Sequence, residues 1–226
     1  MASEDPLVQR VRPPAGDPPA ALVLMHGRGT DANDLFGFLD FLDPERRLLG
    51  VTVQAPRPGP EGGWMWYEHG GVGFPEPVSF AASVGRLGAT LDELSRASGL
   101  PPARIVLGGF SQGAVMAYAL GLGAGRPLPA GILALSGFMP SVPGFEFDLA
   151  GRHGLPVAIA HGSLDPLIPV DLGRAARDRL DEAGLAVEYH ESPMAHTIDP
   201  RILPELQRWL ALRATPYPSR VARQAQ

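Results

Sequence analysis

The residue with the strongest chemical signal is a serine in a glycine-rich turn. Gly109-Phe110-Ser111-Gln112-Gly113 has the spacing G-x-S-x-G, and its flanks predict a strand over 104–107 and a helix over 112–122. On so sharp a turn the hydroxyl is exposed, and the two glycines relieve crowding around the strained backbone. The pattern predicts that Ser111 is a nucleophile. The alternative is an ordinary serine at the start of a helix in a glycine-rich chain.

A serine hydroxyl is a weak nucleophile without a base, and in this strand-turn-helix arrangement an acid and then a histidine follow it along the chain. Four histidines follow the serine: His153, His161, His190 and His196. The first precedes a predicted strand, the second precedes the best acid, and the third lies in a strand. His196 follows the last predicted strand, where the carboxyl ends of the strands meet, and is therefore the predicted base. The alternative is a loop histidine in solvent.

The acid that orients the base is predicted to be Asp165. It directly follows the predicted strand over 156–160, in His161-Gly162-Ser163-Leu164-Asp165-Pro166. A carboxylate at this edge of the sheet can hold an imidazole in one orientation and stabilise its charged form. The alternative is an aspartate that only shapes a turn.

The negative charge that forms on an attacked carbonyl needs two hydrogen-bond donors. One is expected to be the backbone N–H of Gln112, the residue after the nucleophile. The other is expected from His26-Gly27-Arg28-Gly29, through the N–H of Arg28, because this turn follows the predicted strand over 20–25. His26 itself is interpreted as a structural, hydrogen-bonded residue. The alternative is an ordinary glycine turn.

A long connection over 56–77 is rich in glycine, proline and aromatic residues, and its length suggests a functional loop. We expect it to form a wall of the substrate pocket, although the same aromatic residues could simply fold onto the core. The predicted lining residues of this loop are Trp64, Trp66, Tyr67 and Phe74. Apolar residues that flank the other strand ends are predicted to add to the lining: Met139, Leu167, Ile168 and Met194.

Apolar runs and helical periods alternate along the chain, which indicates an α/β fold with a mostly parallel central sheet and helices on both faces. Strands are predicted over 20–25, 49–54, 104–107, 130–135, 156–160 and 186–190, with a short first strand over 7–11. Helices are predicted over 31–42, 79–98, 112–122, 171–183 and 200–212. We expect an irregular lead-in over 1–18, one catalytic domain over 19–213 and a frayed tail over 214–226.

Composition excludes several classes of function. The net charge of −5 and the lack of a basic block argue against a nucleic-acid partner. No apolar run is long enough to span a membrane, and no secretory signal is seen. The 226 residues include no cysteine and no lysine, which excludes disulfides, thiolate metal sites and lysine chemistry. We expect a cytoplasmic protein with a small-molecule ester substrate and no cofactor or metal; a homodimer is left open.

Together these motifs resemble the phospholipase/carboxylesterase family of α/β-hydrolases, which includes the acyl-protein thioesterases. The matching pieces span about residues 20–212: Leu24 to Leu35, Gly108 to Ala114, Ala134 to Gly137, His161 to Pro169 and Ala195 to Ile198. By this resemblance Ser111, Asp165 and His196 form the catalytic triad, and Arg28 and Gln112 supply the oxyanion hole. Ala195 departs from the family, which commonly has glycine before the histidine; the catalytic loop is expected to differ slightly, without changing the assignment.

The resemblance implies an α/β-hydrolase fold without a large lid domain and a serine hydrolase that works through an acyl-enzyme. Because the chain has no room for a large lid, we expect small esters of short to medium acyl length as substrates. Acyl thioesters and lysophospholipids are alternatives within the same chemistry. A non-catalytic ligand-binding module is the alternative of a different class.

Overall fold

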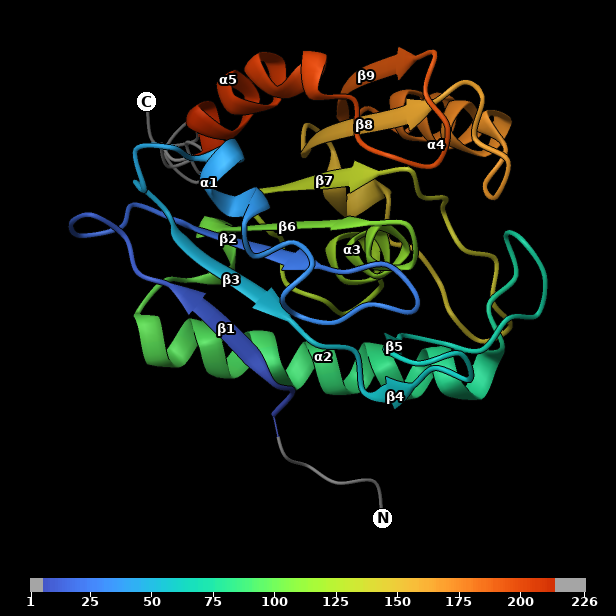
Figure 1. The fold of residues 1–226 in the computed structure, drawn as a ribbon, viewed down its shortest axis with the longest axis horizontal. Helices are drawn as coiled ribbons and strands as arrows, with labels where there is room; N and C mark the ends of the chain where they lie inside the picture. Colours follow the sequence, from blue (N-terminus) through green and yellow to red (C-terminus); the bar gives the residue numbers. More distant parts are fainter. Residues whose placement is uncertain (1–5, 214–226) are drawn as a thin grey trace.

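The computed structural model describes residues 6–213. Strands alternate with helices along most of the chain (Figure 1). The strands are β1 Gln9–Arg12, β2 Ala21–Met25, β3 Leu49–Val53, β4 Arg57–Pro58, β5 Trp64–Met65, β6 Ile105–Phe110, β7 Gly131–Leu135, β8 Pro156–Gly162 and β9 Ala186–Ser192. The α-helices are α1 Phe38–Leu42, α2 Pro77–Ser98, α3 Gln112–Leu122, α4 Val170–Glu182 and α5 Leu203–Arg213. Short 3-10 turns are η1 Pro102–Arg104, η2 Ala150–Arg152 and η3 Pro200–Ile202.

Seven strands form one twisted sheet in the order β1-β3-β2-β6-β7-β8-β9. β1 runs antiparallel to β3, and every other neighbouring pair is parallel. The predicted α/β fold with a mostly parallel sheet is confirmed. The carboxyl ends of the parallel strands lie together on the right of Figure 1, so the loops that follow them meet there.

Helices cover both faces of the sheet because the buried strands are apolar on both sides. In β2, Ala21, Val23 and Met25 pack into one hydrophobic cluster, together with residues of α2, α3 and α4. Leu22 and Leu24 point the other way, into a second cluster with residues of α1 and α5. The alternation follows the two-residue period of a strand, which places successive side chains on opposite faces.

The helix predicted over 31–42 is wrong over its first seven residues, since α1 begins only at Phe38. Asp31 accepts the N–H of Asn33 on its side chain, at 2.7 Å, and this local hydrogen bond favours a turn over a helix. Two successive turns follow, closed by the N–H groups of Asp34 and Phe36. The apolar residues at 35, 39 and 42 still reach the core, which explains the helix-like period.

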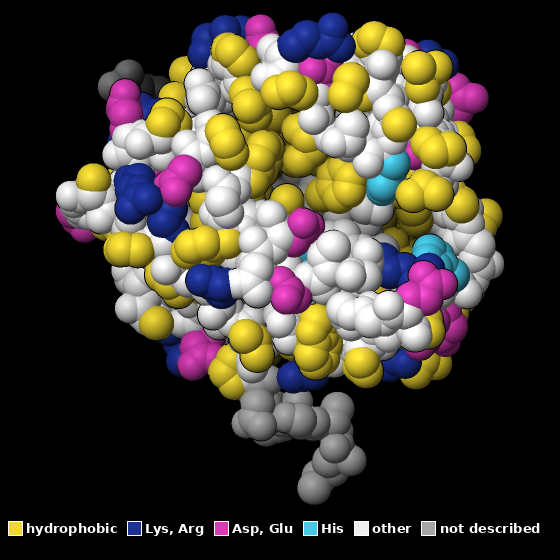
Figure 2. All heavy atoms as spheres, viewed as in Figure 1, with side chains coloured by type: hydrophobic (Ala, Val, Ile, Leu, Met, Phe, Trp, Pro, Cys, Tyr) yellow, Lys and Arg dark blue, Asp and Glu magenta, His cyan; other side chains and the backbone are white. Residues whose placement is uncertain are grey.

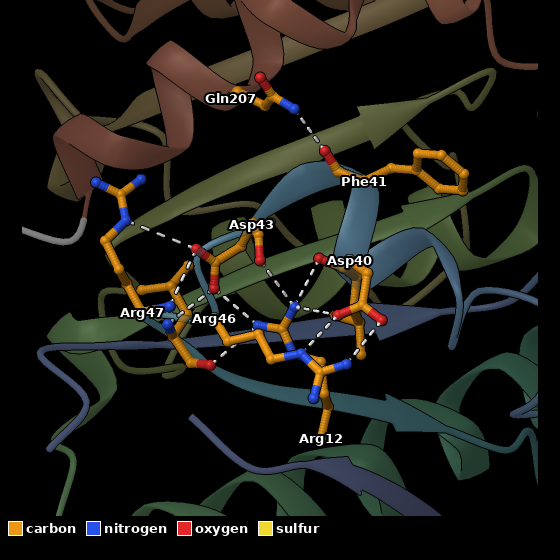
Figure 3. A network of polar contacts seen from close by, with 9 residues as sticks. Arg12, Asp40, Phe41, Asp43, Arg46, Arg47 and Gln207 are labelled. Atoms are coloured by element: carbon orange, nitrogen blue, oxygen red, sulfur yellow. Dashed lines mark hydrogen bonds and ion pairs between the residues drawn. The ribbon is translucent and has the colours of Figure 1, made fainter. Parts of the chain in front are cut away.

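The strand β1 lies within the predicted lead-in over 1–18, near the short strand expected over 7–11. A buried guanidinium holds this segment: Arg12 is 2.7 Å from Asp43 and donates to the carbonyls of Leu39 and Leu48 (Figure 3). Gln207 of α5 donates to the carbonyl of Phe41 in α1, which links the two helices of this face. Residues 1–5 of the lead-in and the predicted tail over 214–226 lie outside the described residues.

The two outer strands of the sheet carry charged side chains. β1 presents Arg10 to solvent. At the other edge β9 carries Glu188 and Glu191, and Glu191 pairs with Arg174 of α4 at 2.6 Å. Within residues 6–213 no helix is long and apolar enough to cross a membrane.

Candidate active site

Ser111 lies between β6 and α3 in a backbone conformation that L-residues rarely adopt, with φ 55° and ψ −120°. The flanking glycines are required by packing. A Cβ on Gly109 would lie 2.7 Å from the carbonyl oxygen of Met25, and one on Gly113 would overlap the same carbonyl. Only glycine at both positions lets the first turn of α3 approach the end of β2. The sequence motif therefore corresponds to a strained, closely packed strand-to-helix turn, as expected for an exposed nucleophile.

Asp165 and His196 are joined by a short hydrogen bond. The Nδ1 of His196 lies 2.6 Å from Oδ2 of Asp165, whose side chain is fully buried. The other oxygen, Oδ1, accepts the N–H groups of Leu167 and Ile168, both at 2.9 Å. Burial alone would raise the pKa of Asp165, but the bonds from Ile168, His196 and Leu167 outweigh it and hold the pKa below its usual range. The carboxylate is therefore ionised and accepts from Nδ1–H, which leaves Nε2 of His196 as the basic nitrogen.

The imidazole of His196 also packs against Phe110, the residue before the serine, with ring centroids 4.8 Å apart. Ser111 and His196 line the same cavity. The structure thus brings the three predicted residues of the triad to one place, at the carboxyl ends of β6, β8 and β9.

Two backbone N–H groups are available beside the serine. Arg28 lies in the turn after β2, and Gln112 begins α3. Neither N–H donates to a backbone carbonyl of residues 6–213, and both residues line the cavity with Ser111. The side chain of Gln112 has a different task. It accepts the N–H of Trp66 at 2.9 Å and donates to the carbonyl of Tyr67 at 3.0 Å, which ties the aromatic loop to α3.

The cavity has a volume of about 470 Å³ and opens where the parallel strands end. On that side of the molecule one histidine side chain lies among hydrophobic side chains, and another lies beside acidic and basic ones (Figure 2). Of the predicted pocket residues, Tyr67, Leu167 and Ile168 line this cavity. The cavity can therefore hold a small apolar group next to the serine.

The other predicted pocket residues do not line the cavity: Trp64, Trp66, Phe74, Met139 and Met194. Trp66 is fully buried; its indole Nε1 donates to the carbonyl of His26 at 2.8 Å, and its ring packs on that histidine. The indole of Trp66 therefore points into the core, where its hydrogen bond holds it. Trp66 supports the turn after β2 and does not form a pocket wall. Trp64 is half-buried in the short β4–β5 pairing, and Phe74 is 59% exposed.

Other residues line the cavity that the sequence did not single out: Thr30, Asp34, Gly59–Gly62, His69, Val72, Phe110 and Phe138. Gly59–Gly62, His69 and Val72 belong to the loop over 56–77, which was expected to form a wall of the pocket. Thr30 and Asp34 follow β2, and Phe138 follows β7, so their position after parallel strands was the available signal. Burial and then the nearby Arg28 guanidinium lower the pKa of His69, so this imidazole is neutral near pH 7. Within the described range, no three histidine or carboxylate side chains are grouped to hold a metal ion.

Comparison with known proteins assigns the chain to a family. The sequence profile of the phospholipase/carboxylesterase family matches residues 7–213. The chain belongs to this family. It is therefore a member of a serine-hydrolase family, and the resemblance seen in the sequence is confirmed.

Relatives of this phospholipase/carboxylesterase family member include esterases and thioesterases. Acyl-protein thioesterase 1 of Neurospora crassa is 41% identical over 108 residues, which cover 44% of this chain and 42% of that protein. The protein of the same name from Emericella nidulans is 25% identical over 217 residues, 84% of this chain and 89% of the relative. The chain thus spans less than half of the first relative and most of the second. The crystal structure of esterase PE8 superposes with a TM-score of 0.77 at 27% identity, covering 92% of this chain and 99% of the esterase.

Proposed function

We propose that this protein is a carboxylesterase that cleaves esters of short to medium acyl chain, with Ser111, Asp165 and His196 as its catalytic residues. The observation that carries the proposal is the Asp165–His196 hydrogen bond of 2.6 Å beside a serine in strained geometry, at one cavity. The apolar lining and the cavity of about 470 Å³ favour small acyl groups over long ones.

The mechanism follows from these positions. Nε2 of His196 takes the proton from Ser111 Oγ as the oxygen attacks the ester carbonyl carbon. The carbonyl oxygen becomes negative and accepts the N–H groups of Arg28 and Gln112. His196 then gives the proton to the leaving alkoxide, which departs as an alcohol. Water, activated by the same nitrogen, hydrolyses the acyl-serine and restores the enzyme.

An aryl-leaving organophosphonate tests the nucleophile directly. We expect one phosphonyl group per chain, found on Ser111 by peptide mass spectrometry, with proportional loss of esterase activity. Ser111→Ala should lower kcat for an aryl butyrate by at least about 10⁴-fold, as loss of a nucleophile does in serine hydrolases. Ser98→Ala, at the far end of α2, is the control and should keep the wild-type rate. Labelling of another residue would refute the proposal, as would substantial activity in Ser111→Ala.

Thioester hydrolysis is the second candidate, and the alignments with acyl-protein thioesterases favour it. The two functions share the nucleophile and differ in the leaving group. Oxygen esters and thioesters of the same acyl group distinguish the two functions. Both give the same acyl-enzyme, so only the rate of acylation differs between them. A carboxylesterase should show the higher kcat/KM on the oxygen ester, and its rate should fall from butyrate and octanoate to laurate. A preference for the thioester or for laurate would instead favour the thioesterase.

A further inference from the structure

The peptide group between Gly27 and Arg28 is held from one side by two side chains. The carbonyl oxygen of Gly27 lies 2.6 Å from Nδ1 of His26 and accepts the hydroxyl of Thr30 at 3.0 Å. The same hydroxyl also lies 3.1 Å from Nδ1 of His26 and 3.3 Å from Oδ2 of Asp34. A trans peptide group is planar, so its C=O and N–H point in opposite directions. Whatever fixes the carbonyl of Gly27 therefore also fixes the direction of the N–H of Arg28.

The imidazole of His26 can donate to Gly27 only if the proton is on Nδ1, and a second contact sets this tautomer. The backbone N–H of Ala55, just after β3, donates to Nε2 of His26 at 3.0 Å, so Nε2 carries the lone pair. The ring is 1% exposed, and Trp66 packs against it with centroids 5.6 Å apart. Burial lowers the pKa of His26, which keeps the ring neutral and both contacts intact near pH 7.

We infer that His26 and Thr30 are positioning residues for the oxyanion hole: they fix the Gly27 carbonyl and thereby direct the Arg28 N–H toward the carbonyl that Ser111 attacks. This inference rests on the proposed function. His26 does not line the cavity, and the hydroxyl of Thr30, which does line it, is bonded to the Gly27 carbonyl. Their effect is on kcat, because an oxyanion donor acts only where charge develops in the transition state.

Two substitutions at position 26 separate the orientation of the Arg28 N–H from the stability of the fold. An asparagine amide reaches the position of Nδ1, so His26→Asn keeps a donor for Gly27 but loses the acceptor for Ala55. A glutamine amide reaches the position of Nε2, so His26→Gln can accept from Ala55 but loses the donor. We expect kcat to fall about 10- to 100-fold in His26→Gln and less than about fivefold in His26→Asn, a part of the effect of deleting an oxyanion donor. Stability should show the opposite order, with His26→Asn the less stable variant.

A matched pair of threonines gives a second test, which does not depend on the buried ring. Thr30→Val and Thr52→Val each remove a hydroxyl that donates to a loop carbonyl, Gly27 in the first case and Ala32 in the second. Valine keeps the shape of threonine in both. Thr30→Val should lower kcat about 5- to 20-fold, below the effect of losing a whole oxyanion donor, with little change in KM. Thr52→Val should be destabilised and keep its kcat.

A trifluoromethyl ketone completes the test, because its serine adduct carries an oxyanion, whereas a product carboxylic acid binds without one. Across the variants the inhibition constant of the ketone should rise in proportion to the loss in kcat/KM, while that of the acid stays within about twofold, as expected for an interaction made only in the transition state. If His26→Gln and His26→Asn lose kcat equally, or if kcat follows thermal stability in all variants, the inference is overturned. Failure of the proposed function is distinguishable, since the phosphonate would then not label Ser111 of the wild type.

Discussion

The turn after β2 and the turn at the end of β8 begin with the same dipeptide but present different groups to the site. His26-Gly27 leads to a backbone N–H, that of Arg28, whereas His161-Gly162 leads to the carboxylate of Asp165. Both rings are buried and bind a carbonyl of their own turn: His26 through Nδ1 to Gly27, and His161 through Nε2 to Ile168 at 2.9 Å. The second glycine is required by a close approach, since a Cβ on Gly162 would overlap the backbone of residues 194–195, next to His196. A Cβ on Gly27 would lie 3.3 Å from the ring of Phe110 and 3.5 Å from the Cβ of Ser111, so this position is tight but not closed to a side chain.

The difference lies in how each group is held. Within residues 6–213 the free N–H of Arg28 makes no backbone hydrogen bond that could orient it. Its direction is therefore set by the rest of the peptide group, which His26 holds with both ring nitrogens hydrogen-bonded. A carboxylate accepts several bonds, so Asp165 is oriented directly by the N–H groups of Leu167 and Ile168. His161 makes one hydrogen bond to its turn, and its Nδ1 has no hydrogen-bond partner in the described part of the chain. Its Nε2 also lies 3.6 Å from Oδ2 of Asp165. We therefore expect the first turn to depend on its histidine more than the second does.

Removing the charge of the Asp165 carboxylate, which the second turn presents, should have the largest effect on kcat. Asp165→Asn can keep the bonds from Leu167 and Ile168, but a neutral amide no longer stabilises the protonated His196. We expect kcat for an aryl ester to fall about 10³- to 10⁴-fold with KM little changed. The control is Asp199→Asn, which alters another buried carboxylate that accepts a backbone N–H, here that of Arg201. A loss below about tenfold in Asp165→Asn, measured under single-turnover conditions, would contradict the role of this turn.

Trp66→Ala tests the support behind the first turn. It should lower the free energy of unfolding by about 3–5 kcal/mol, the usual cost of emptying a buried aromatic site. Trp66→Phe keeps most of the ring and loses the indole bond to His26, which costs about 1 kcal/mol. Urea unfolding measures both. Because Trp66 does not line the cavity, the order of rates along an acyl-chain series should stay unchanged in Trp66→Phe; an altered order would place the indole in the pocket after all.

The amide substitution that preserves kcat should differ between the two histidines. His26 donates through Nδ1, which asparagine can replace, whereas His161 donates through Nε2. At position 161 glutamine can replace the donor to Ile168, so His161→Gln should keep kcat within about threefold. His161→Leu leaves that carbonyl unpaired and should cost about 1–3 kcal/mol of stability. We expect its kcat to fall less than about tenfold, which corresponds to less than about 1.4 kcal/mol in the barrier, because Leu167 and Ile168 still orient Asp165 through their N–H groups. An equal loss of kcat in His26→Gln and His161→Leu would contradict the expected difference between the two turns.

The smallest effect is on the pH dependence of stability. Burial lowers the pKa of folded His26 below its ordinary value of 6.5, while the hydrogen bond to Gly27 and the charges of Asp34 and Asp31 offset part of this shift. The unfolded chain therefore binds more protons, so stability is full above pH 6.5 and is lost as the pH falls toward the folded pKa. One proton contributes a slope of at most about 1.4 kcal/mol per pH unit. Urea midpoints between pH 7.5 and 5.5 should fall less steeply in His26→Asn than in the wild type; parallel slopes would contradict the shift.

Most of the fold could be predicted because it follows from local patterns. The helix expected over 112–122 is observed as Gln112–Leu122, and the buried parallel strands appear as short apolar runs. The convergence of Ser111, Asp165 and His196 could be anticipated for a related reason: residues that follow parallel strands meet at one edge of the sheet.

The lining of the cavity could be predicted only in part, as with Tyr67, Leu167 and Ile168, because the rest depends on contacts between segments far apart in the sequence. Trp66 points into the core through its bond to His26, 40 residues earlier, and nothing local distinguishes it from a pocket residue. The start of α1 was misjudged for the opposite reason: a single side-chain bond from Asp31 to its neighbour outweighs an apolar period that fits a helix.

The charged outer strands bear on how copies of this protein meet one another. An open strand edge is a template on which a second chain can extend the sheet, and charged side chains make such pairing costly. Here β1 carries Arg10, and β9 carries Glu188 as well as Glu191, whose charge is paired with Arg174. Edge-to-edge pairing of like strands would therefore bring Arg10 or Glu188 toward its own copy. Association at high concentration should therefore use helical faces, and cross-β aggregates should form only after an outer strand has detached from the sheet.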